Sequence, residues 1–211
     1  MSNRKVKVKI CGVTLPSQAR EIAALGADYI GCVIEFSKSP RSVTRSYAKQ
    51  LRDALKGTRA ALVGVAVDIP LRELLAMMPH LDLNVVQLHG NESPEYVKRL
   101  RRRGVEVWKV VTRENYTRFA GVADAVQVDA VNPMHGAGGS GMRSDWDFAR
   151  QLVDEGYTTV LSGGLNPDNV QEGITRAQPL VVDVSSGVEA SPGIKDLSKV
   201  VRFITKATMY G

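Results

Sequence analysis

The segments Leu161-Ser-Gly-Gly-Leu-Asn-Pro-Asp-Asn-Val170 and Val181-Val-Asp-Val-Ser-Ser-Gly-Val-Glu189 share one layout: an apolar run, then small residues, then a turn. Each apolar run is typical of a buried strand. Asn166 and Pro167 are typical of a helix start, with Asn166 as the cap. Backbone N–H groups beside small residues and at a helix N-terminus bind anions. The segments therefore predict a phosphate site, with ordinary tight turns as the alternative; its members are Gly163, Gly164, Ser185, Ser186 and Gly187.

Working outward from these segments, the chain alternates between apolar strands and helices that carry caps or a terminal glycine. Strands are expected at residues 6–11, 29–34, 60–67, 84–88, 105–111, 125–128, 158–161 and 180–184. Helices are expected at residues 16–26, 44–56, 70–78, 93–104, 146–155 and 195–206, with another from Pro167 and a short one within 114–119. Asp68 and Asp145 are expected to cap two of them.

Eight strand–helix alternations in 211 residues predict parallel strands joined by crossover helices. Eight units predict a closed (β/α)₈ TIM barrel, shorter than the ~250 residues that are typical. The alternative is an open doubly wound sheet, but no G-x-G-x-x-G follows the first strand, where a dinucleotide site would need it. No linker or composition shift divides the chain, so residues 1–211 are expected to form one domain.

Composition excludes several classes of function. No signal peptide or membrane-spanning run is expected, and the two cysteines lack paired spacing, so we expect reduced thiols and a cytoplasmic location. The net charge of +6 favours anionic ligands. The basic run Lys98-Arg-Leu-Arg-Arg-Arg103 is read as a solvated helix end rather than a nucleic-acid patch, and the few aromatic residues are not interleaved with it. No nucleic-acid partner and no membrane partner is expected.

Reactive side chains occur where strands end. Cys11 closes the first strand, His89 the fourth, Asp129 the sixth and Asp183 the eighth, while Arg41 lies in the loop after the second. Each alone has an ordinary interpretation, as a packed thiol, a structural histidine, a turn cap or a solvated cation. In a TIM barrel, however, all of these strand ends meet at one face, which carries the active site.

The chemistry of these residues favours proton transfer. Cys11 has no adjacent histidine to activate it as a nucleophile. A general-base thiolate opposite a general-acid carboxyl group, Asp129, would suit an isomerisation. Cys11 must then ionise more easily than a free thiol, with help from neighbouring Lys9, and Asp129 must keep a proton. No cluster of Cys or His has metal-ligand spacing, so no metal is expected.

Six motifs together resemble the phosphoribosylanthranilate isomerase family over nearly the whole chain. They are Lys9-Ile-Cys-Gly-Val-Thr14, Lys38-Ser-Pro-Arg41, Val86-Gln-Leu-His-Gly90, Val128-Asp129 with Gly138-Gly-Ser-Gly141 and Asp145-Trp146, Ser162-Gly-Gly-Leu-Asn-Pro167, and Val182-Asp-Val-Ser-Ser-Gly-Val-Glu189. The resemblance implies a TIM barrel of tryptophan biosynthesis that uses no cofactor. It implies an Amadori rearrangement of the small phosphorylated substrate N-(5-phosphoribosyl)anthranilate to 1-(2-carboxyphenylamino)-1-deoxyribulose 5-phosphate. A monomer or a homodimer is expected.

The resemblance also assigns roles. Cys11 matches the base that removes the C2′ proton, and Asp129 the acid that protonates the furanose oxygen. Arg41 matches the residue near the anthranilate carboxylate, and His89 and Asp183 match positions lining the pocket. The glycines and serines named above match the phosphate cradle. Residues 31–41 depart from the family form: the segment is one residue longer, and Cys32 and Glu35 are unusual there.

Two other functions remain open. An isomerase that also accepts the analogous histidine-pathway aminoaldose would need a second phosphate site, but no Gly-rich loop follows the third or fourth strand. A non-catalytic barrel that binds phosphate ligands or nucleic acid would fit the positive charge, but would not need Cys11 and Asp129 at strand ends.

Overall fold

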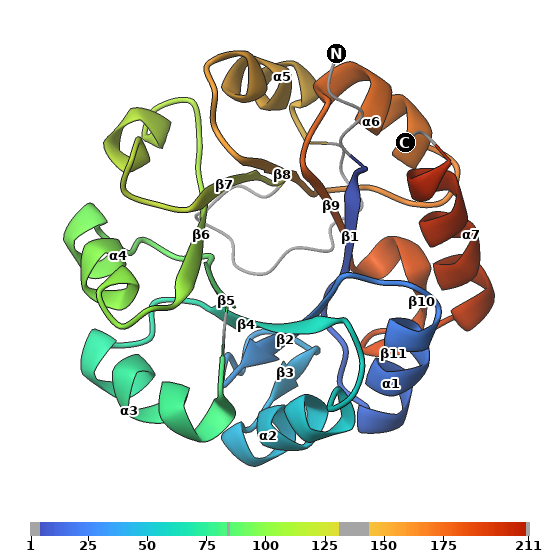
Figure 1. The fold of residues 1–211 in the computed structure, drawn as a ribbon, viewed down its shortest axis with the longest axis horizontal. Coiled ribbons are helices and arrows are strands. Elements are labelled where there is room, and N and C mark those ends of the chain that lie inside the picture. The colour runs from blue at the N-terminus through green and yellow to red at the C-terminus, as the bar shows by residue number, and fades with distance from the viewer. Residues whose placement is uncertain (1–4, 84, 131–143, 210–211) are drawn as a thin grey trace.

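The computed structural model describes residues 5–83, 85–130 and 144–209. Eight strands pair in parallel around a ring, and β1 pairs with both β2 and β9, which closes the barrel (Figure 1). The ring strands are β1 (Lys7–Ile10), β2 (Tyr29–Ile34), β4 (Ala61–Ala66), β5 (Val85–Leu88), β6 (Glu106–Val110), β7 (Ala125–Val128), β8 (Thr159–Leu161) and β9 (Val181–Val184). The predicted TIM barrel is confirmed, and each predicted strand is present with ends that differ by at most one residue; the predicted first residue of β5, Asn84, lies outside the described residues.

Helices surround the ring (Figure 1). They are α1 (Pro16–Ala24), α2 (Arg45–Ala54), α3 (Leu71–Leu81), α4 (Pro94–Arg101), α5 (Trp146–Asp154), α6 (Val170–Ala177) and α7 (Leu197–Thr208), with the 3-10 helix η1 (Tyr116–Phe119) between β6 and β7. The predicted cap at Asp145 is present, since its side chain accepts a hydrogen bond from the Phe148 N–H at 2.9 Å. Within the described residues, no helix has both the length and the apolar character to cross a membrane.

Two predicted helix caps are wrong. α6 begins at Val170, because the Asn166 side chain accepts hydrogen bonds from the N–H groups of Asp168 and Asn169 and forms a turn before the helix. Asp68 does not cap α3, which begins at Leu71. Its carboxylate instead accepts a hydrogen bond from the Asn91 N–H at 2.6 Å and ties two loops together.

Three short strands were not predicted. β3 (Ser42–Val43) pairs in parallel with β2 inside the expected polar loop. β10 (Glu189–Ser191) and β11 (Ile194–Lys195) form an antiparallel hairpin after the 3-10 helix η3 (Ser186–Val188), so the last helix starts at Leu197 rather than Lys195. Strands of two or three residues carry too little periodicity to be recognised from sequence.

The barrel interior contains an apolar layer and a polar layer. The apolar layer lies toward the beginnings of the strands and consists of Tyr29, Val63, Val85, Trp108, Ala125, Val160, Leu180 and Val181. Two residues further along β5, β7 and β9 stand Gln87, Gln127 and Asp183, and Lys9 of β1 lies at the same level, bonded to Gln87 and Asp183. Because side chains alternate across a strand, both layers point inward. The polar layer therefore supports whatever stands at the strand ends.

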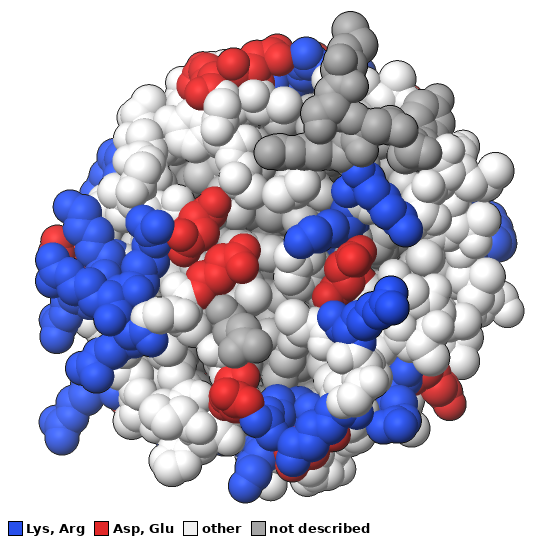
Figure 2. Space-filling view, viewed as in Figure 1, with Lys and Arg blue, Asp and Glu red and all other residues white. Residues whose placement is uncertain are grey.

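The basic run forms part of the outer surface. Lys98, Arg99 and Arg101 lie in the last turn of α4, with Arg102 as its C-cap. Figure 2 shows Lys and Arg gathered over this helix. Cations at this position face the negative end of the helix dipole, as expected for a solvated helix end.

Candidate active site

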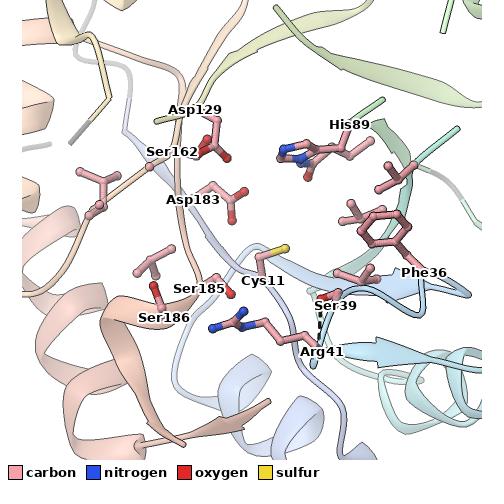
Figure 3. A pocket seen from close by; sticks show the side chains of 18 residues that line it. Cys11, Phe36, Ser39, Arg41, His89, Asp129, Ser162, Asp183, Ser185 and Ser186 are labelled. Carbon is pink, nitrogen blue, oxygen red and sulfur yellow. Dashed lines mark hydrogen bonds between the residues drawn. The ribbon is translucent and has the colours of Figure 1, made fainter. Parts of the chain in front are cut away.

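A cavity of about 700 Å³ of empty space, partly open to solvent, opens where the ring strands end. Figure 3 shows its labelled side chains, which come from opposite sides of the barrel. Nine of the ten predicted site residues line it: Cys11, Arg41, His89, Asp129, Gly163, Gly164, Asp183, Ser185 and Ser186. We call this space the central cavity.

Cys11 stands immediately after β1. Its N–H donates to the Val184 carbonyl of β9 at 2.8 Å, which fixes the backbone at this point. Burial raises the pKa of the Cys11 thiol above its ordinary value, while Lys9 and Lys195 act to lower it. The expected easier ionisation is therefore wrong for the protein without substrate, because loss of water around the sulfur outweighs the nearby cations.

Lys9 is completely buried beneath Cys11. Its Nζ donates to Asp183 Oδ2 and to Gln87 Oε1, both at 2.7 Å. Burial lowers the pKa of Lys9, but the Asp183 carboxylate and the Cys11 thiol outweigh that effect and raise it above the ordinary value. Lys9 therefore stays charged inside the barrel, with Asp183 as its counter-ion.

The same lysine fixes the hydrogen bonding of His89. An ammonium group only donates, so Gln87 must turn Oε1 to Lys9 and its Nε2 then donates to His89 Nδ1 at 3.2 Å. Burial lowers the pKa of His89, with Lys109 and Lys9 acting in the same direction against Asp129. The imidazole is therefore neutral, and its proton lies on Nε2, the nitrogen free to donate to a ligand.

Asp129 and Asp183 lie on one side of the central cavity, and both point into it (Figure 3). Asp183 is 4% exposed, and its Oδ2 accepts from Lys9 and from Gln127 Nε2 at 3.1 Å. Within the described part of the chain, Asp183 Oδ1 is buried without a hydrogen-bond partner. A buried carboxylate oxygen without a partner is costly, so this atom is suited to accept a hydroxyl group of a ligand.

The predicted phosphate loops after β8 and β9 pack directly on each other. A Cβ on Gly187 would stand 2.0 Å from the Leu165 carbonyl oxygen, so only glycine permits this contact. Gly163 and Gly164 have φ values of +82° and +66°, which favour glycine. Gly187 is the one predicted residue that does not line the central cavity; it joins the two loops instead.

Arg41 is held by a carboxylate that the sequence did not identify. Its Nε and Nη2 donate to the two oxygens of Glu189 in β10 at 2.8 and 2.7 Å. Lys195 in β11 donates to the same carboxylate at 2.8 Å. Burial acts to raise the pKa of Glu189, but these hydrogen bonds outweigh it and lower that pKa to about 2. The hairpin thus fixes the guanidinium, whose Nη1 makes no hydrogen bond among the described residues and can bind an anion.

Arg41 lies closer to the phosphate loops than its predicted role suggests. A Cβ on Gly12 would touch both Arg41 Cδ and Ser185 Oγ, at 2.6 and 2.9 Å. In Figure 3 the guanidinium extends toward Ser185 and Ser186, while Phe36 stands on the other side of the cavity. The apolar part of the lining is formed by Val33, Phe36, Val65, Val67, Leu165 and Val184.

No metal centre accompanies these groups in the parts of the chain that the structure describes. There, no three or more His, Cys, Asp or Glu side chains are arranged to hold an ion. The glycine-rich residues 135–141, of which 138–141 belong to one of the six motifs, lie outside the described residues.

Known proteins resemble this chain along its length. The family model for N-(5'-phosphoribosyl)anthranilate (PRA) isomerase matches residues 8–206. The N-(5'-phosphoribosyl)anthranilate isomerase of Aquifex aeolicus is 39% identical over 95% of this chain and 98% of its own. The chain belongs to the phosphoribosylanthranilate isomerase family.

Solved structures of this family share the fold. A structure of phosphoribosyl anthranilate isomerase in complex with reduced 1-(o-carboxyphenylamino)-1-deoxyribulose 5-phosphate has a TM-score of 0.81 and 34% identity, covering 96% of this chain and 98% of that one. Monomers of a dimeric phosphoribosylanthranilate isomerase from Thermotoga maritima have a TM-score of 0.82 and 34% identity with the same coverage. The family resemblance predicted from six motifs is confirmed.

The motifs contained several residues around the cavity that were not selected from sequence. Lys9 and Gln87 lie inside two of the motifs, but the sequence does not show that they contact each other. Their hydrogen bond is evident only in the structure, where both side chains point into the barrel. Glu189 ends another motif, and Lys195 lies in what was expected to be a helix. The available signal was the strand periodicity at residues 9–11. Residues two apart in a strand point to the same side, so Lys9 must share the inward face of Cys11.

Proposed function

We propose that this isomerase performs the Amadori rearrangement of N-(5-phosphoribosyl)anthranilate to 1-(2-carboxyphenylamino)-1-deoxyribulose 5-phosphate, with Cys11 as general base and Asp129 as general acid. The observation that carries these roles is that a thiol and a carboxyl group from distant strands line one cavity beside two glycine- and serine-rich loops. This arrangement supports proton transfer at two atoms of one bound sugar phosphate.

Proton transfers in this reaction balance within the site. Asp129 donates a proton to the ring oxygen as its bond to C1′ breaks, and the nitrogen lone pair forms a protonated imine. The Cys11 thiolate then takes the C2′ proton, and the electron pair of that C–H bond gives an enolamine. The enolamine becomes the ketone when the Cys11 thiol gives a proton to C1′ and the C2′ hydroxyl gives its proton to the Asp129 carboxylate. Both groups thereby return to their starting states, and no oxidant or metal ion is consumed.

Each end of the substrate has a complementary part of the cavity. Gly163, Gly164, Ser185 and Ser186 would hold the phosphate through backbone N–H groups and hydroxyls. The aromatic ring would lie against the apolar lining that includes Phe36. Arg41 would bind the anthranilate carboxylate through the edge that Glu189 leaves free. His89 Nε2–H and Asp183 Oδ1 would bind sugar hydroxyls.

The test is a fluorescence assay that generates phosphoribosylanthranilate in situ and follows its loss. Cys11→Ala and Asp129→Asn should each lower turnover by at least ~10², the usual contribution of an acid–base group. Cys32→Ala is the matched control, since that thiol is buried in β2 and does not line the cavity. Near-normal turnover in Cys11→Ala or Asp129→Asn would remove the role assigned to that residue.

All groups used above come from one chain, so we propose that each barrel is active as a monomer and that a homodimer would carry two independent sites. Sedimentation analysis combined with activity measured across dilution tests this: turnover per chain should be constant. A free thiol at the site also supports a reducing compartment such as the cytoplasm. Fractionation of the source cells would test that location.

A further inference from the structure

We propose that Lys9 is a positioning residue that stabilises the thiolate form of Cys11, and that the absent side chain of Gly31 is what lets the two side chains meet. The proposal deepens the base role of Cys11 and therefore rests on the proposed function. It concerns the barrel interior below the substrate, and it gives a structural basis to the influence of Lys9 on Cys11 that the sequence suggested.

The first support is the geometry around Gly31 in β2. A Cβ at this position would stand 2.8 Å from Cys11 Sγ and 3.0 Å from Lys9 Cε. The ends of both side chains therefore occupy the space over one bare backbone position. Any larger residue would force the sulfur and the lysine away from β2.

The second support is the hydrogen bonding of the ammonium group. An ammonium carries three N–H donors, and Lys9 uses two of them on Asp183 and Gln87. The third has no partner among the described residues, and the end of the lysine chain and the Cys11 sulfur both lie over the backbone of Gly31. With two of its bonds made to groups on β5 and β9, the ammonium cannot follow solvent or turn away from Cys11.

The third support is the set of charges that face Cys11. They are Lys9 on β1, Asp183 on β9, Lys195 on β11 and Arg41 before β3, with the Cys32 thiol on β2. Arg41 and Lys195 share the Glu189 carboxylate, which offsets part of their effect. Among the groups that oppose burial, Lys9 has the largest influence on the pKa of Cys11, larger than the contrary influence of Asp183. Replacing Lys9 by a neutral residue should therefore make the thiol harder to ionise.

The experiment follows alkylation of Cys11 by iodoacetamide against pH in the full chain, with the labelled site mapped by mass spectrometry. Only the thiolate reacts, so the midpoint of the rate profile reports its ionisation. In Lys9→Met the midpoint should rise by about 1 to 3 pH units, the range for loss of a nearby opposite charge. The acid limb of kcat/KM should move in the same direction.

Lys109→Met is the matched control. Lys109 is also buried, but its Nζ binds Glu92 at 3.1 Å and the carbonyls of Leu88 and Gly90. The Cys11 midpoint should not move in this variant. If Lys9→Met does not fold, the double variant Lys9→Met/Asp183→Leu removes the whole ion pair, which is generally better tolerated than removal of one partner. The Cys11 midpoint of the double variant should also lie above that of the unmodified protein, but by less than in Lys9→Met.

A Cys11 midpoint that is unchanged or lower in these variants would overturn the proposal. Because alkylation requires no turnover, this result is independent of the proposed function. Full activity of Cys11→Ala would remove the base role of the thiol while leaving the ionisation measurement intact.

Discussion

The two layers inside the barrel lie one above the other, two residues apart on β5, β7 and β9, and have opposite properties. In the layer toward the strand beginnings, Trp108 packs edge-on against Tyr29 with ring centroids 4.9 Å apart. In the next layer, Lys9 makes hydrogen bonds across the barrel to Gln87 and to Asp183 on the neighbouring strand β9. The apolar layer removes apolar surface from water, whereas the polar layer places charged groups away from water.

The difference separates stability from chemistry within one interior. The apolar layer stabilises the closed ring without contacting a ligand. The polar layer is costly to bury, and it leaves Asp183 Oδ1 and Gln127 Oε1 without partners among the described residues. Its benefit is the orientation of Cys11 and His89 at the strand ends. Changes in the first layer should therefore affect unfolding, and changes in the second should affect turnover.

The largest expected effect is in the apolar layer. Trp108→Ala should lower the free energy of unfolding by about 3 to 5 kcal/mol, the usual cost of removing a buried aromatic ring. The kcat measured well below the melting temperature should change little, since Trp108 does not line the central cavity. Urea denaturation and steady-state kinetics test both statements. A large loss of kcat with unchanged stability would mean that the two layers are not separate.

Gly31→Ala should lower kcat and change the free energy of unfolding little, the reverse of Trp108→Ala. The added methyl group would stand 2.8 Å from Cys11 Sγ, so the sulfur must move. A displacement near 1 Å can cost about 10²-fold in rate. Gly64→Ala in β4 is the matched control, because its methyl group would meet Leu83 and Ile34 in the outer core instead. The control should lose stability and keep its kcat; equal losses of kcat in both variants would contradict the comparison.

The features of the barrel that depend on strand periodicity were predictable from the sequence. Apolar runs and glycine stops predicted the ring, and the ends of those runs located Cys11, His89, Asp129 and Asp183 at one face. The interior contacts were not predictable, because the partner of Lys9 depends on which strands lie opposite each other after closure. β5 and β1 are not neighbours in the sheet, and only the barrel brings Gln87 to Lys9.

Short elements and competing effects account for the remaining errors. The β10–β11 hairpin is too short to show a pattern, so Glu189 could not be assigned as the partner of Arg41. The pKa of Cys11 was expected to fall because Lys9 is adjacent in sequence. Sequence gives the adjacency of charges but not the depth of burial, and burial was the stronger influence.

Arg41 lies at the rim of the polar layer, and its replacement tests which anion it binds. Arg41→Ala should raise KM by about 10- to 100-fold, as expected for loss of a hydrogen bond between charged groups, with a smaller change in kcat. Inhibition constants for anthranilate and for ribose 5-phosphate would show which anion it binds. The proposed role predicts weaker anthranilate binding alone. Weaker binding of ribose 5-phosphate alone would place Arg41 at the phosphate. Arg20→Ala, on the outer helix α1, is the control.

The smallest effect concerns the hairpin that holds Arg41. The pKa of Glu189 is lowered to about 2 in the folded protein, below the value of about 4.3 for a free glutamate. A depressed carboxyl pKa contributes stability that is fully present above the unfolded value and is lost as pH falls toward the folded one. Stability of the unmodified protein relative to Glu189→Gln should therefore decrease as pH falls from about 5.5 toward 3, and should be constant above about 5.5. Urea denaturation of both proteins at several pH values measures this difference. A difference that does not change with pH would show that the Glu189 carboxylate titrates alike in the folded and unfolded chains, and that Arg41 is not held by its charge.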